Sequence, residues 1–198
     1  MRRQSNVLAR AVWARGIFPH QFAWLLDNPL RRLIITPGEL ADRLPLQADS
    51  SVLEIGPGSG YFSVELAART PRGRLHLVDA QPEMLMKARA KLESRRFTHI
   101  VYSVGDAGAG LPIEKGTIDV AVLVSVLGEV SDMTRCLTLL FDVLRPGGVV
   151  AIHESLPDPD LVPQRELITL AERAGLIPEK LIGRRWNYTA LLRRPPAP

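Results

Sequence analysis

Three glycines at alternate positions form the clearest candidate ligand site in the sequence. Gly56, Gly58 and Gly60 follow the short apolar run 52–55, which carries one acid, Glu54. Glycine permits a left-handed turn and lets a ligand approach the backbone, because it has no Cβ. Such a turn between a strand and a helix presents backbone N–H groups and the positive end of the helix to a ligand. The stretch predicts a loop that holds a nucleotide-like molecule, with an ordinary strand-to-helix turn as the alternative.

Two further acids follow apolar runs downstream of this loop. Asp79 follows the run 75–78, close to the roughly 20-residue separation expected between a glycine turn and a ribose-binding acid. A carboxylate at that position can accept hydrogen bonds from both ribose hydroxyls. Asp106 follows the run 100–104, and its location after a third strand favours a second ligand contact over a plain Gly-Asp turn.

The glycine spacing separates this loop from a dinucleotide site. Dinucleotide sites read G-x-G-x-x-G, whereas the last two glycines here stand one residue closer together. The stretch 54–60, E-x-G-x-G-x-G, resembles the first motif of the class I S-adenosylmethionine-dependent methyltransferases. The stretch 78–85, an acid followed by a helix that begins with proline, resembles the second motif, and Leu-Arg-Pro-Gly-Gly at 144–148 is another recurrent feature of that family. The resemblance covers about residues 38–194.

The resemblance implies S-adenosylmethionine as the cofactor and a set of residues that bind it. In this family the acid after the second strand holds the ribose, and the acid after the third strand, with the next backbone N–H, holds the adenine. Carried over to this sequence, the cofactor-binding residues are Glu54, Gly56, Gly58, Gly60, Tyr61, Asp79, Ala80, Met84, Asp106, Ala107 and Ser125. The Leu-Gly-Glu turn after the fourth strand is similar to the small-molecule and quinone-type branch. The tetrapeptide typical of nucleic-acid amino-methylating members is absent.

Three side chains near the ends of the fourth and fifth strands are candidate bases: Glu129, His153 and Glu154. We expect an in-line transfer of the methyl group, for which the protein mainly supplies positioning and desolvation. A base is needed only where the acceptor must lose a proton. A histidine with an ordinary pKa near 6.5 suits that role. The alternative for Glu154 is that it only orders the following loop.

The elements that must position these residues alternate between strands and helices. Together with the resemblance, they predict an α/β fold: a Rossmann-like, seven-stranded, mostly parallel sheet with an antiparallel C-terminal hairpin and helices on both faces. The run 118–124 is almost wholly apolar and is therefore expected at the centre of the sheet. The predicted strands are 52–55, 75–78, 100–104, 118–124, 149–152, 181–182 and 188–192.

The remaining helices and the ends of the chain complete the prediction. The residues from Thr36 to Glu39 predict the start of a helix with a capping box. An amphipathic helix is expected over 133–144. We predict three parts: a helical cap or extension at 1–37, the cofactor-binding domain at 38–194 and a tail at 195–198. Residues 1–26 contain four arginines and no acid. A helix packed on the domain is favoured there, and a transit peptide or a peripheral membrane contact are the alternatives.

Composition limits the classes of function. Hydrophobic residues make up 46% of the 198-residue chain and charged residues 23%, as in ordinary globular proteins. The net charge of +4 comes without a dense basic stripe, which disfavours a nucleic-acid partner. The single cysteine, Cys136, is expected inside a helix, fits a cytoplasmic setting and predicts neither a disulfide framework nor a metal site.

We therefore expect a methyltransferase that acts on a small-molecule acceptor. A catalytically silent S-adenosylmethionine-binding module that works through a protein partner is the alternative. No motif in the sequence identifies the acceptor or the oligomeric state.

Overall fold

The computed structural model of the chain describes residues 35–197. It contains seven strands: β1 Ser51–Ile55, β2 Arg74–Asp79, β3 Ile100–Val104, β4 Ile118–Val124, β5 Leu144–Ser155, β6 Ile177–Arg184 and β7 Asn187–Arg193. The helices are α3 Pro37–Arg43, α4 Ser63–Arg69, α5 Pro82–Glu93, the short 3₁₀ helix η3 Leu127–Glu129, α6 Met133–Val143 and α7 Gln164–Arg173.

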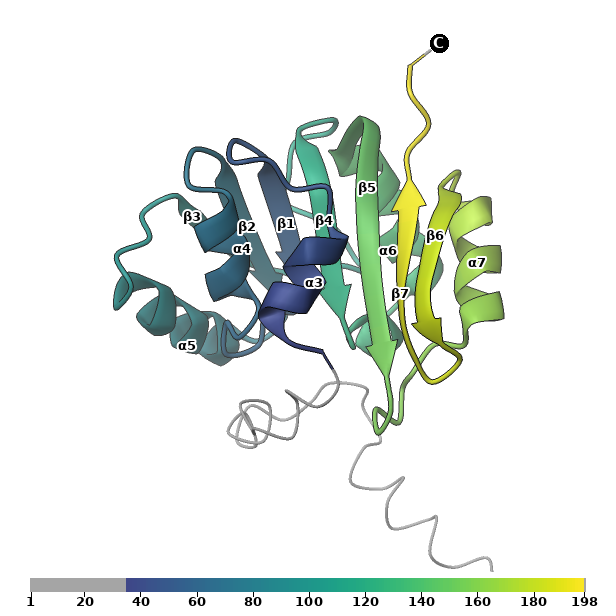
Figure 1. The fold of residues 1–198 in the computed structure, drawn as a ribbon, viewed down its shortest axis with the longest axis horizontal. Helices are drawn as coiled ribbons and strands as arrows, with labels where there is room; N and C mark the ends of the chain where they lie inside the picture. The colour runs from purple at the N-terminus through teal and green to yellow at the C-terminus, as the bar shows by residue number, and fades with distance from the viewer. Residues whose placement is uncertain (1–34, 198) are drawn as a thin grey trace, which may run out of the picture.

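The strands form one sheet in the order β3-β2-β1-β4-β5-β7-β6 (Figure 1). The first five strands pair in parallel, whereas β7 is antiparallel to both β5 and β6. This arrangement confirms the predicted mostly parallel sheet with a C-terminal hairpin. It also confirms the central place of β4, which is buried because helices cover both faces of the sheet.

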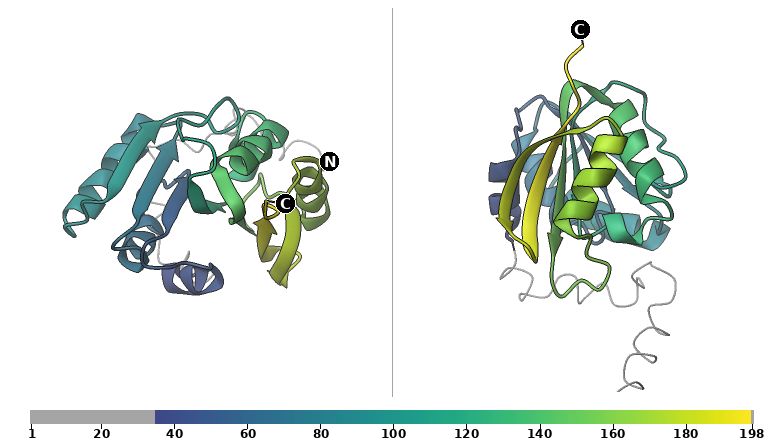
Figure 2. Two further views of the ribbon diagram at one scale, coloured as in Figure 1. Left: turned by 90° about the horizontal axis from the view of Figure 1, so that it is seen from above. Right: turned by 90° about the vertical axis from the view of Figure 1, so that its right-hand side faces the viewer.

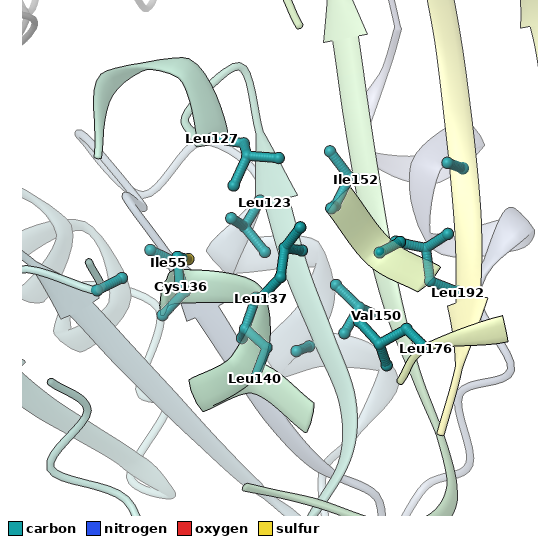
Figure 3. Packing of buried hydrophobic residues seen from close by; sticks show 14 of the residues in the cluster. Ile55, Leu123, Leu127, Cys136, Leu137, Leu140, Val150, Ile152, Leu176 and Leu192 are labelled. Carbon is teal, nitrogen blue, oxygen red and sulfur yellow. The ribbon is translucent and has the colours of Figure 1, made fainter. Parts of the chain in front are cut away.

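The helices lie on the two faces of the sheet, with α3 and α6 on opposite sides (Figure 2). Alternate residues of each strand point to opposite faces, so the sheet has two separate cores. On one face Val149 and Ala151 belong to the core that α3, α4 and α5 cover. On the other face Val150 and Ile152 pack with leucines of α6, including Leu137 (Figure 3).

The fifth strand is longer than the sequence predicts. Its expected span is 149–152, but β5 runs from Leu144 to Ser155. Its far end is extended because residues 149–155 pair with β7, a contact between segments that lie far apart in the sequence. His153 and Glu154 therefore lie inside the strand and not beyond its end.

The predicted capping box at the start of α3 is confirmed. The Thr36 hydroxyl accepts a hydrogen bond from the Glu39 backbone N–H at 3.2 Å. In return the Thr36 backbone N–H donates to the Glu39 carboxylate at 2.8 Å. These two bonds satisfy N–H groups that have no partner within the helix, and so fix where α3 begins.

The N-terminal predictions fall outside the described part of the chain. The expected helix in residues 1–26, its alternatives and most of the extension at 1–37 lie in residues 1–34, which the structure does not describe. The predicted domain boundaries accordingly stay predictions. Over residues 35–197, every helix is too short or too polar to cross a membrane.

The core beneath α6 gives a direct test of the fold. Leu137 is fully buried, so Leu137→Ala should lower the free energy of unfolding by about 2–5 kcal/mol in a urea titration, since it leaves a cavity. Leu181 on the edge strand β6 is 48% exposed, and Leu181→Ala should change that free energy by less than about 0.5 kcal/mol. Equal losses in the two variants would contradict this assignment of the core.

Candidate active site

A cleft of about 280 Å³ opens at the carboxyl ends of β1, β2 and β4. This is the lower edge of the sheet in Figure 1, toward which the arrowheads of β4 and β5 point. β1 has β2 on one side and β4 on the other, so the chain leaves β1 where the strand order reverses. Open α/β sheets bind ligands at such a point. The cleft is lined by residues 54–58, 62, 78–81, 84, 105–107, 124–126 and 129–131.

The glycine loop is shaped by contacts that a side chain would prevent. Gly56 has a φ of 64°, and a Cβ there would lie 2.5 Å from a methyl carbon of Val126. Its N–H donates to the Val78 carbonyl at 2.8 Å, which ties the loop to the end of β2. Gly58 follows with a φ of 55° and also lines the cleft. Only glycine fits position 56, because both the backbone angle and the space exclude a side chain.

Gly60 and Tyr61, which sequence reasoning placed among the cofactor residues, do not line the cleft. Gly60 has a φ of 80°, and a Cβ there would lie 3.0 Å from the Ala88 Cα on α5. This glycine lets the loop pack closely against α5. The Tyr61 ring lies edge-on to Phe62, which does line the cleft.

Glu54 brings a buried carboxyl to the floor of the cleft. The residue is 3% exposed, and its carboxylate accepts a hydrogen bond from the Ser63 hydroxyl at the start of α4. The pKa of Glu54 is raised to about 7: burial raises it most, the Ser63 hydrogen bond lowers it and the Asp79 carboxylate adds a smaller rise. Near neutral pH, a bound cation can therefore shift Glu54 to its charged form.

Asp79 ends β2 and faces the same cleft. One carboxylate oxygen accepts from the Gln81 backbone N–H at 2.9 Å, and the other accepts a longer bond of 3.4 Å from the Gly58 N–H. Burial raises the pKa of Asp79, and these two backbone bonds oppose the rise. The carboxylate is held in place by the loop beside it and is available to accept hydrogen bonds from a ligand. Ala80 and Met84, also predicted as cofactor residues, line the cleft next to it.

Asp106 joins the loop after β3 to the segment after η3. Its carboxylate accepts from the Gly108 N–H at 2.8 Å. The pKa of Asp106 is lowered most by a hydrogen bond from the Ser131 side chain. Backbone hydrogen bonds from Gly108 and Ser131 lower it further. The carboxylate is therefore charged at neutral pH. Ala107 lies beside it in the cleft, as the sequence predicts.

Ser125 carries the chain from β4 into the cleft wall. Its φ of 53° lies in the left-handed region that non-glycine residues rarely adopt, at a cost of about 1–3 kcal/mol. Its backbone N–H donates to the His153 carbonyl at 2.8 Å, which holds this conformation against β5. Strained residues of this kind are found at ligand sites, and Ser125 lines the cleft.

Of the three candidate bases, Glu129 alone lines the cleft. His153 is buried, and its Nδ1 lies 3.0 Å from the Thr189 hydroxyl, which also accepts from Arg43 at 2.7 Å. Glu154 is buried on the opposite face of β5. Because neighbours along a strand point to opposite faces, these two side chains cannot both face one cleft. Their catalytic roles stay predictions.

Sequence reasoning missed several lining residues: Phe62, Val78, Gln81, Val124, Val130 and Ser131. Most come within a few residues of a strand end, and that position is the signal that could have identified them. Ser131 is the most informative, because its bonds to Asp106 join two loops that the sequence separates. Cys136 is buried in α6, as predicted. Among residues 35–197, no cluster of His, Cys, Asp or Glu is suited to hold a metal ion.

The burial of Glu54 predicts a pH dependence of stability. Its folded pKa of about 7 lies above its ordinary value of 4.5, so the folded state retains a proton that the unfolded state has lost between these values. Rising pH therefore lowers the free energy of unfolding across that range. Urea titrations should show the stability of Glu54→Gln relative to wild type increasing from pH 4 to pH 8. Glu172→Gln, at an exposed position on α7, should show no such trend. A difference in stability between Glu54→Gln and wild type that does not change with pH would contradict the raised pKa of Glu54.

The chain is similar to known methyltransferases in sequence and in fold. A family model described as a methyltransferase domain matches residues 52–148. Trans-aconitate 2-methyltransferase from Methylobacterium radiotolerans is 31% identical over 137 residues, which cover 69% of this chain and 49% of that protein. Demethylmenaquinone methyltransferase from Lactococcus lactis is 36% identical over 109 residues, which cover 54% and 43%. The chain thus matches about half or less of the length of these curated relatives.

The fold has close counterparts among solved structures. A SAM-dependent methyltransferase from Aquifex aeolicus superposes with a TM-score of 0.81 and 19% identity, over 89% of this chain and 99% of that one. The part of this chain that the family model matches begins in β1 and ends in β5. It therefore includes every strand end that lines the cleft.

Proposed function

From the premise that the chain belongs to the class I S-adenosylmethionine-dependent methyltransferases, we propose that it transfers a methyl group from this cofactor to a small-molecule acceptor. The observation that carries the proposal is the cleft itself. It gathers Glu54, Asp79 and Asp106 from the ends of three different strands around one glycine loop. These are the residue types, in the order along the chain, that the resemblance to the family implies for binding the cofactor.

The cofactor's parts can be assigned to the sides of the cleft. The loop at Gly56 and Gly58 offers backbone N–H groups and the Glu54 carboxyl to the amino-acid tail. Asp79 accepts hydrogen bonds from the ribose hydroxyls, with Ala80 and Met84 beside it. Asp106 and the Ala107 N–H bind the adenine. This leaves Ser125 and the segment that follows it facing the methyl group, which is where an acceptor must approach.

The reaction needs little covalent chemistry from the protein. When bound, the cofactor would supply a methyl group activated by its positively charged sulfur, and transfer of that group to a lone pair of the acceptor would leave a neutral thioether. The protein aligns the two molecules and excludes water. Where the acceptor carries a proton on the attacking atom, Glu129 is the candidate that takes it, since this carboxylate lines the cleft beside Ser125.

The acceptor class is the finer part of the proposal. The names of the trans-aconitate and demethylmenaquinone relatives support a small molecule, and the second supports a quinone- or lipid-like one. A peripheral membrane contact through residues 1–26 would suit such an acceptor and stays a proposal. The alternative function, a silent cofactor-binding module with a protein partner, would be favoured by cofactor binding without turnover on any acceptor.

The ribose contact gives the first test. Calorimetric titration with S-adenosylmethionine and with S-adenosylhomocysteine should show that Asp79→Ala weakens binding by about 1.5–3 kcal/mol, the range for hydrogen bonds to a charged group. This corresponds to at least about tenfold in Kd. Asp49→Ala removes an exposed carboxylate just before β1, at the opposite edge of the sheet, and should leave the Kd unchanged. Failure of the wild type to bind either ligand would overturn the proposed function.

A second test separates binding from catalysis. In assays of S-adenosylhomocysteine formation with a panel of carboxylates, quinols and amines, Glu129→Gln should lower kcat by about 10²–10⁴-fold on an acceptor that must lose a proton. The Kd for the cofactor should stay within about twofold of wild type. Unchanged kcat on such an acceptor would exclude Glu129 as the base.

A further inference from the structure

Glu154 is a buried carboxyl that the proposed reaction does not use. It lies near the end of β5 and is only 1% exposed. Its Oε2 accepts from the Val162 backbone N–H at 3.2 Å, whereas Oε1 is buried and has no hydrogen-bond partner in the part of the chain that the structure describes. A buried carboxylate with a vacant oxygen is costly, so the neutral form is favoured. Burial, the largest effect, raises the pKa of Glu154 to about 8.

The charged neighbours of Glu154 favour the same neutral form. Asp158 and Asp160, from the loop between β5 and α7, and Glu129, from η3, all raise the pKa of Glu154. On β7, Tyr188 lies directly opposite Glu154 in the pairing of the two strands. Its hydroxyl donates to the Val162 carbonyl, so Glu154 and Tyr188 together hold both polar groups of that residue's backbone.

Glu166 on α7 and Glu154 both raise the pKa of Tyr188. An ionised Glu154 would add a negative charge to those of the acids on the loop and on η3. Among residues 35–197, the Val162 N–H bond alone opposes the rise in the pKa of Glu154.

The loop at 156–162 packs directly against the wall of the cleft. A Cβ at Gly128, the middle residue of η3, would overlap the backbone carbonyl oxygen of Asp160. This close approach presses the loop backbone against η3. The next residue, Glu129, lines the cleft on the other side. The contacts therefore run from Glu154 through Val162 and Asp160 to the residue that faces the acceptor.

We propose that Glu154 is a positioning residue, whose neutral carboxyl holds the loop 156–162 against η3 and thereby fixes Glu129 at the acceptor side of the cleft. Loss of the proton releases the loop, because moving Asp158 and Asp160 toward solvent separates their charges from the new one. The assignment of Glu129 to the acceptor side rests on the proposed function. The attachment of the loop does not.

The pH range follows from the position of the titration. Between its ordinary value of 4.5 and about 8, Glu154 keeps its proton only while the loop is held, so rising pH weakens the attachment of the loop across this range. One unit above its pKa, the ionised form of an acid exceeds the neutral form by about tenfold. By pH 9 Glu154 is therefore ionised even while the loop is held, and the loosening should have levelled off.

Amide hydrogen exchange of residues 156–162 tests this attachment without any ligand. Rates are corrected for the intrinsic effect of pH and referred to the amides of β4, so that changes in global stability cancel. In wild type, and in the exposed-charge control Glu172→Gln, protection of the loop should fall about tenfold between pH 6.5 and pH 9. In Glu154→Gln it should stay constant, because the amide can accept from Val162 but cannot ionise. An equal fall in Glu154→Gln, or none in wild type, would overturn the proposal.

A second variant changes the titration without touching Glu154. Asp160→Asn removes a like charge of nearly the same shape, so it should lower the pKa of Glu154 and move the midpoint of the loss of protection to lower pH. A midpoint that stays in place or moves upward would contradict the role of the loop acids.

The pH profile of turnover connects the loop to the cleft. On an accepted substrate, kcat of the wild type should fall between pH 6.5 and pH 9 relative to that of Glu154→Gln, while the Kd for S-adenosylhomocysteine changes equally in the two proteins. Parallel kcat profiles would show that the loop does not position Glu129. Absence of S-adenosylhomocysteine binding would overturn the proposed function and leave the exchange result standing, so the two failures are distinguishable.

Discussion

The contact between the loops that leave β1 and β4 is the constraint on which the cleft depends. The chain leaves β1 through Gly56 and leaves β4 through Ser125, and both residues have left-handed backbones. The loops approach so closely that a Cβ at Gly56 would collide with Val126. The two loops meet where β1 has parallel neighbours on both sides and the strand order reverses, which is where open α/β sheets bind ligands. The positions of Asp79 and Asp106 are set relative to this junction.

Buried carboxyls recur around the cleft, and each weakens the fold at high pH. Burial raises the pKa of Glu54, Asp79 and Glu154. The ionised form of each carboxyl is therefore less stable in the folded chain than it is in water. Stability alone does not explain such residues, because apolar side chains would fit the core without this cost. Perturbed carboxyls gathered at one cleft are typical of functional sites. Glu54 and Asp79 face the ligand, whereas Glu154 lies behind the wall.

Local patterns in the sequence predicted most of the elements and the cofactor side of the cleft. The capping box at Thr36, the glycine turn and the apolar run of β4 each depend on residues close together in the chain, so periodicity and residue type suffice to identify them. The length of β5 could not be predicted in this way. Its last residues are strand because they pair with β7, and that partner is specified more than 30 residues later in the chain.

The sequence alone determined the family, the order of the strands along the chain and the acids at the ends of β2 and β3, because each is a local motif. The tertiary structure decided which candidate bases face the ligand. Glu129, His153 and Glu154 all follow or end apolar runs, and nothing in their types distinguishes them. The pleat of β5 and its register with β7 turn His153 and Glu154 to opposite buried faces, whereas the 3₁₀ turn brings Glu129 into the cleft. Register is a long-range property, and for that reason spacing along the chain could not supply it.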